Sequence, residues 1–168
     1  MKNKPEATFK EKVKFKTWTC GFLAGLIATT ALTTISLTLH FTGIIPLSIT
    51  EYGARFILHI PNKSMHTGTW VVGIITNYSL GGLFGILSAY LYKTTGPEEK
   101  LIKLSGIAFC MWFFQLALVP ALDSTVAKYS TYDTTIAYYL LYHLWSLIAT
   151  FFIIKYLKFP DRNQALTK

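Results

Sequence analysis

The sequence predicts an all-α integral membrane protein: a four-helix bundle in up-down-up-down order, with a longer outer loop between its first and second helices. Three observations predict this fold class. Hydrophobic residues make up 52% of the chain and charged residues 14%, with a mean hydropathy of +0.40, which is too apolar for an ordinary soluble domain. The charged residues gather between four long apolar runs. Two of the connections between runs are short, which makes neighbouring helices antiparallel.

Each apolar run is long enough to cross about 30 Å of hydrocarbon, which takes roughly 20 helical residues. The runs extend from Trp18 to Phe41, from Trp70 to Tyr92, from Leu104 to Leu122 and from Thr134 to Tyr156. Backbone in lipid must satisfy its own hydrogen bonds, so only helices or a closed barrel are possible. Barrel strands are shorter and alternate apolar with polar residues, which these runs do not. A transmembrane domain is therefore predicted over 18–157, between basic tails at 1–17 and 158–168.

The basic residues predict the orientation. Of the 16 Lys and Arg, all but Arg55, Lys63 and Lys128 fall on one predicted side: in the two tails, in the connection between the second and third runs and, for Lys155, at the end of the fourth run. Positive charge collects on the cytoplasmic side, so both termini are expected in the cytoplasm. The net charge of +8 is thus a topology signal. Because no basic patch interleaves with aromatic residues, no nucleic-acid partner is expected.

The long connection, residues 42–69, carries Glu51, Arg55 and His59 at four-residue spacing between Pro46 and Pro61. This spacing is typical of one side of a short helix lying at the membrane surface. The alternative is an irregular loop that caps the bundle. The residues leave both readings open.

Small residues predict where the first two long helices touch. Gly73, Gly81 and Gly85 belong to a ridge of the second run that recurs every four residues, and Gly21 and Gly25 open the first. Small residues on one ridge let another backbone approach closely, so these two helices are expected to pack through them. The alternative is an ordinary glycine-rich membrane helix.

A polar layer is predicted near the middle of the bundle. In the fourth run Tyr139, His143 and Ser146 follow one stripe, which should face the bundle interior because lipid penalises polar groups. Asn77 and Gln115 lie at a similar depth in the second and third runs, and Thr29 or Thr33 could contribute from the first. The favoured interpretation is that these groups satisfy one another and fix helix register. The alternative is a proton relay, ion path or ligand pocket in which His143 titrates near neutral pH.

Two outer features complete the candidates. The outer surface is predicted to carry groups that could bind zinc: His40, Glu51, His59, His66 and Asp123. Their spacing fits no known site, so neither a metal nor another cofactor is expected. Pro120 predicts a bend or an end near the outer end of the third helix.

The chain resembles the small four-span bacterial inner-membrane proteins grouped as domains of unknown function. The resemblance lies in "GFLAGLIA", "GGLFGILSAYLY", "LVPALD" and "YHLWSL", and covers most of 18–157. It implies an inner-membrane location and assigns no functional residues. The chain also lacks a serine–histidine–acid set, a phosphate loop and paired carboxylates. We therefore expect a non-catalytic structural or accessory component, with the lipid bilayer and a second copy or another membrane protein as partners. The alternative is a small transporter or channel working through the layer around His143.

Overall fold

The computed structural model describes residues 15–59, 66–118, 121 and 132–158. Over these residues the protein is all-helical, as predicted. The elements are α1 (Thr17–Phe41), α2 (Ile49–Leu58), α3 (Thr67–Thr95), α4 (Lys100–Phe113), the π-helical segment η1 (Phe114–Leu118) and α6 (Tyr132–Tyr156). Four helices are long and apolar enough to cross a membrane: α1, α3, α4 continued through η1 to Ala117, and α6. These match the four apolar runs of the sequence.

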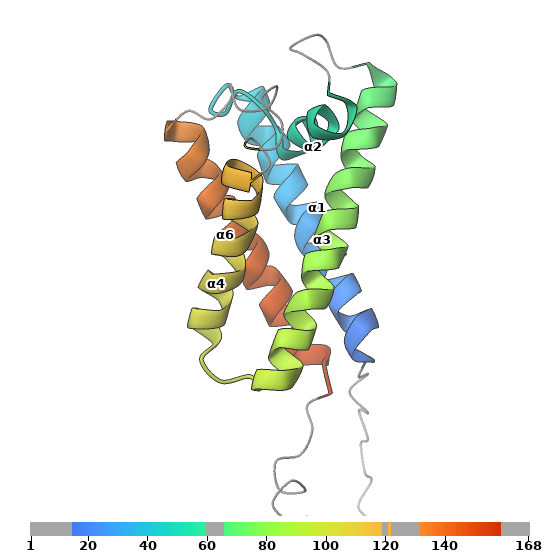
Figure 1. The fold of residues 1–168 in the computed structure, drawn as a ribbon, viewed down its shortest axis with the longest axis vertical. Helices are drawn as coiled ribbons and strands as arrows, with labels where there is room; N and C mark the ends of the chain where they lie inside the picture. Colours follow the sequence, from blue (N-terminus) through green and yellow to red (C-terminus); the bar gives the residue numbers. More distant parts are fainter. Residues whose placement is uncertain (1–14, 60–65, 119–120, 122–131, 159–168) are drawn as a thin grey trace, which may run out of the picture.

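The start of α1, the turn from α3 to α4 and the end of α6 lie at one end of the molecule, the lower end in Figure 1. The backbone N–H of Phe15 donates to the carbonyl of Tyr156 at 3.1 Å, which ties the start of α1 to the end of α6. In the α3–α4 turn, Lys103 Nζ donates to the carbonyls of Gly96 (2.9 Å) and Glu98 (2.7 Å). This lysine therefore satisfies backbone groups that the end of α3 leaves unpaired.

α1 and α3 make a very close helix contact through glycines. A Cβ built on Gly21 would lie 2.6 Å from the carbonyl oxygen of Gly85, and a Cβ on Gly85 would lie 2.7 Å from the Cα of Gly25. The Thr29 side chain occupies the space where a Gly81 side chain would be. Only glycine permits two backbones at this separation.

Gly73 belongs to the same ridge but contacts a different helix. A Cβ there would meet the carbonyl oxygen of Thr50 and would lie 3.1 Å from the Cβ of Ala54, both on α2. The expected packing of Gly73 on the first helix is therefore corrected. The chain returns from α1 through α2, which packs against the first part of α3.

Residues 49–58 form a helix rather than an irregular loop. Ser48 and Glu51 make a capping box: the Ser48 N–H donates to Glu51 Oε2 at 2.9 Å, and the Glu51 N–H donates to Ser48 Oγ at 3.2 Å. The polar side of α2 faces the protein, since Glu51 and Arg55 are both buried. Glu51 Oε2 also lies 3.2 Å from Nε2 of His40 on α1. This geometry fixes α2 across the end of the bundle (Figure 1).

The third membrane-span candidate changes geometry before Pro120, which itself lies outside the described residues. α4 gives way to the π-helical segment η1 at Phe114. A proline has no N–H to donate to the carbonyl four residues earlier, which for position 120 is that of Leu116. Leu116 lies within η1, so this missing donor accounts for the departure from α geometry there. η1 positions the candidate site described next.

Candidate functional site

A cavity of about 380 Å³ lies inside the bundle, between α3 on one side and α4 with η1 on the other. α3 packs against α1 and α2, and α4 packs against α6. The rings of Phe84 on α3 and Phe114 on η1 meet edge to face with centroids 6.2 Å apart. The volume of the cavity falls within the range of about 300–1,000 Å³ that is typical of small-molecule sites. The apolar side chains that line it are Leu32, Ile49, Phe56, Ile57, Ile75, Leu80, Phe84, Met111 and Phe114.

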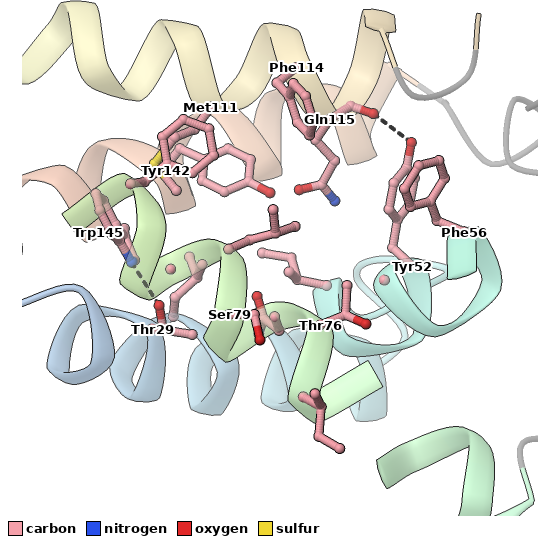
Figure 2. A pocket seen from close by; sticks show the side chains of 18 of the residues that line it. Thr29, Tyr52, Phe56, Thr76, Ser79, Met111, Phe114, Gln115, Tyr142 and Trp145 are labelled. Atoms are coloured by element: carbon pink, nitrogen blue, oxygen red, sulfur yellow. Dashed lines mark hydrogen bonds between the residues drawn. The ribbon is translucent and has the colours of Figure 1, made fainter. Parts of the chain in front are cut away.

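The inner end of the cavity is closed by Trp145 of α6. This indole is completely buried, and its Nε1 donates to Oγ1 of Thr29 at 3.0 Å (Figure 2). A buried indole N–H needs such an acceptor, and the close α1–α3 contact places Thr29 where it can accept. Asn77, which also lines the cavity, donates from Nδ2 to Oγ1 of Thr33 at 2.7 Å. These two polar lining groups are thus paired within the protein.

The outer end of the cavity is formed by η1 and α2. The hydroxyl of Tyr52 donates to the backbone carbonyl of Gln115 at 2.5 Å. The Gln115 side chain points into the cavity, on the side of Tyr142 (Figure 2). Its Nε2 is buried and has no hydrogen-bond partner. A buried donor left unpaired costs about 1–3 kcal/mol. Among the described lining residues, Gln115 is the one whose buried side-chain donor lacks an acceptor.

Exposed lining residues mark the mouth of the cavity. Ile57, Ile75 and Ser79 all line it and are exposed. They lie on α2 and α3, on the flank of the bundle. The lining residues of α3 run from Ile75 to Phe84, nine residues of helix or about 13.5 Å at 1.5 Å per residue. The cavity is therefore elongated along α3 and opens sideways.

The structure does not bring the five residues of the predicted polar layer together. Asn77 and Gln115 line the cavity. Ser146 is buried elsewhere, where its Oγ donates to the carbonyl of Leu104 at 2.8 Å and ties α6 to α4. Of the described contacts, none joins His143 to Asn77 or Gln115.

His143 and Tyr139 instead lie at the outer edge of the α4–α6 contact. Tyr139 is 38% exposed, and its ring packs against Trp112 of α4. The His143 ring lies 4.2 Å from the Tyr139 ring, and its Nδ1 is 3.0 Å from the Tyr139 carbonyl oxygen. Tyr139 and His143 are turned away from the interior because α6 buries its larger aromatic side chains, whereas Ser146 of the same stripe stays buried against α4.

Sequence reasoning missed three of the aromatic residues that shape the cavity: Tyr52, Tyr142 and Trp145. A second stripe of α6 has the same spacing as the predicted stripe of Tyr139, His143 and Ser146, offset by one residue. It consists of Tyr138, Tyr142, Trp145 and Ala149. All four are buried. The size of these aromatic side chains was the available signal, since they remove the most apolar surface from solvent.

The outer histidines and acids do not converge. His40 contacts Glu51, whereas His59 follows α2 in a left-handed conformation and His66 precedes α3. Asp123 lies outside the described residues. Within the described part of the chain, no three His, Cys, Asp or Glu side chains come close enough to hold a metal ion.

The described lining of the cavity is neutral and mostly apolar. Its described lining carries no carboxylate, imidazole, ammonium or guanidinium group. Comparisons of this chain with protein-family models, curated proteins and solved structures found no match. An apolar, neutral space with one unpaired amide donor suits a neutral, mostly apolar molecule that presents an acceptor.

Proposed function

We propose that the chain is a non-catalytic accessory component of the bacterial inner membrane that holds an apolar molecule inside its bundle. The observation that carries this proposal is the cavity, because it is neutral, largely apolar and open on the flank of membrane-span candidates. Its described lining carries no carboxylate, imidazole or amine, the groups that most often act as general acids and bases near neutral pH. The partner implied is the lipid bilayer itself.

The proposal places the four long helices across the bilayer in up-down-up-down order, with both termini in the cytoplasm. Lysines support this orientation. Lys16, Lys93, Lys103, Lys155 and Lys158 all belong to the end that carries the α3–α4 turn (Figure 1). The opposite end carries α2, whose Arg55 is buried. Short segments rich in lysine stay on the cytoplasmic side.

Thiol labelling tests this orientation. Single cysteines are introduced at Thr42, Thr94 and Lys158, all exposed, after Cys20→Ala and Cys110→Ala. In intact cells a membrane-impermeant maleimide should label the variant at 42 only, and after permeabilisation it should label all three. Labelling at 158 from outside would refute the proposed orientation.

The transporter alternative depends on a polar layer around His143. The described contacts of His143 are with Tyr139, and the cavity is lined without either of them. No observation therefore favours transport through this residue, and binding is the function proposed.

A further inference from the structure

We propose that the cavity binds one acyl chain of an outer-leaflet glycerolipid, with the ester carbonyl of that chain accepting a hydrogen bond from Gln115 Nε2. This inference deepens the proposed function and rests on the membrane insertion described there. Three observations lead to it: the depth of the cavity, the position of the unpaired amide and the chemistry of the mouth.

The depth of the cavity matches one leaflet. Its lining follows α3 for about 13.5 Å, from Ile75 to Phe84. The hydrocarbon core is roughly 30 Å thick, so one leaflet contributes about 15 Å. The cavity begins beside α2 and ends at Trp145 (Figure 2), and α2 lies at the end of the bundle opposite the α3–α4 turn (Figure 1). An acyl chain entering from the outer leaflet would therefore run along the cavity towards Trp145.

The unpaired amide lies at the correct end for an ester. Gln115 is three residues before the end of η1 at Leu118. Ser146 Oγ donates to the carbonyl of Leu104, near the start of α4, and so places the α6 turn that carries Trp145 beside that part of α4. Gln115 is eleven residues beyond Leu104 along the chain, so it lies nearer the end of the bundle that carries α2. Ester carbonyls of lipids lie at the outer edge of the hydrocarbon, so this donor meets an acceptor there.

The mouth suits a lipid that stays partly in the bilayer. Ile57 and Ile75 are 52% and 60% exposed, so an apolar rim surrounds the opening. Ser79, also exposed, is the small residue of this rim. One chain can enter between α3 and η1 while the second chain and the headgroup remain outside. The same acceptor chemistry could also come from a free membrane-soluble carbonyl compound, and the experiments below separate the two sources.

The first experiment measures recognition of the ester. Binding of dioleoyl phosphatidylcholine and of its dioleyl ether analogue, which has no carbonyl, is titrated by native mass spectrometry on the full chain in detergent. The ester lipid should bind about fivefold more tightly, because one neutral hydrogen bond contributes about 1 kcal/mol. Gln115→Leu should abolish this preference. Tyr52→Phe is the matched control, since it loosens the same end but keeps the amide, and it should retain the preference.

The second experiment locates the chain. A variant whose sole tryptophan is Trp145, made by Trp18→Phe, Trp70→Phe and Trp112→Phe, is reconstituted in phosphatidylcholine vesicles with dibromostearoyl chains. Bromine quenches tryptophan only at short range, so Trp145 fluorescence should fall relative to vesicles of unbrominated lipid. Ser79→Phe should block the mouth and remove this quenching. Ser105→Phe, the same change on the exposed face of α4, should not.

A reference tryptophan keeps the outcomes separate. Leu147→Trp is combined with Trp145→Phe and with the three other Trp→Phe changes, so that residue 147 carries the only indole. Leu147 is 54% exposed, so this indole lies on the exposed face of α6, two residues from position 145. Quenching at 147 without quenching at 145 would overturn the acyl-chain proposal and leave membrane insertion intact. No quenching at either position would overturn the proposed function as well.

Two further results would also overturn the proposal. Equal binding of the ester and ether lipids by the unmodified protein would show that the carbonyl is not recognised. Quenching of Trp145 by a short-chain benzoquinone in unbrominated vesicles, with none by brominated lipid, would assign the cavity to a free carbonyl compound. Circular dichroism and size-exclusion chromatography of each variant establish that it is folded.

Discussion

Replacing Gly25 by alanine tests the close contact between α1 and α3. A Cβ at this position would overlap the carbonyl oxygen of Gly81, and it would lie 2.9 Å from the carbonyl carbon of the same residue. Both are backbone atoms, so relief requires the helices to separate. Ordinary Cβ contacts begin near 3.4 Å, so the carbonyl carbon alone requires a separation of 0.5 Å (3.4 − 2.9), and the closer oxygen requires more. A gap of about 0.5–1 Å already removes a quarter to a half of the dispersion attraction across a contact.

The expected cost follows from two opposing effects. Forcing an extra methyl group into a packed interface costs about 1–3 kcal/mol, and a clash with backbone places Gly25→Ala at the upper end. Alanine returns about 1 kcal/mol, because it is a better helix former than glycine. The variant should therefore lose about 2 kcal/mol of unfolding free energy. For a chain of this length that corresponds to a melting temperature lower by about 4–8 °C.

Thermal unfolding of the detergent-solubilised protein measures this loss, with Gly106→Ala as the matched control. Gly106 is exposed in α4, and a Cβ there would meet nothing within 4 Å. The control should gain up to about 1 kcal/mol from helix propensity alone. The two alanine substitutions are thus expected to shift stability in opposite directions. Equal shifts, or a stabilised Gly25→Ala, would refute the reasoning from backbone separation.

Three further variants test other contacts. Ser146→Ala should destabilise the protein to unfolding by about 1 kcal/mol or less, since it removes the bond to the Leu104 carbonyl, and a neutral result would contradict that role. Lys103→Met should speed hydrogen exchange in the α3–α4 turn by about fivefold, as expected for about 1 kcal/mol, because three carbonyls lose their donor. Lys100→Met, the control, should leave exchange there unchanged. His143→Phe should change the unfolding free energy by less than about 0.5 kcal/mol, because phenylalanine keeps a ring against Tyr139, and a larger loss would show that the imidazole has a structural role beyond that contact.

The four long helices could be predicted from the sequence because each depends on the length and composition of an apolar run, whereas the short helix α2 could not be distinguished from a loop in this way. The run from Trp18 to Phe41 became Thr17–Phe41, and the run from Thr134 to Tyr156 became Tyr132–Tyr156. The third run differs more, since it starts earlier, at Lys100, and changes to π geometry at Phe114. Apolar length determines whether a segment can span hydrocarbon, and it leaves the local helix type open.

The candidate site could not be predicted, because it depends on how each helix is rotated about its axis. In α6 the stripe of Tyr139 and His143 and the stripe of Tyr142 and Trp145 have equivalent spacing, offset by one residue or about 100°. Depth in the membrane is nearly the same for both. The structure buries the second stripe because it carries the larger aromatic surface. Depth alone therefore grouped His143 with Asn77 and Gln115, which it does not contact.

The same glycines that join α1 to α3 also account for the cavity. Gly81 and Gly85 draw α3 against α1, and Gly73 draws it against α2. α4 is meanwhile held to α6, on the other side of the bundle, by Ser146. Among the described aromatic pairs, the one that joins α3 to η1 is Phe84 with Phe114, and the rest of the space between them is left as the cavity. Separating α1 from α3 by Gly25→Ala would move α3 towards this space, so the variant should lose lipid binding together with stability.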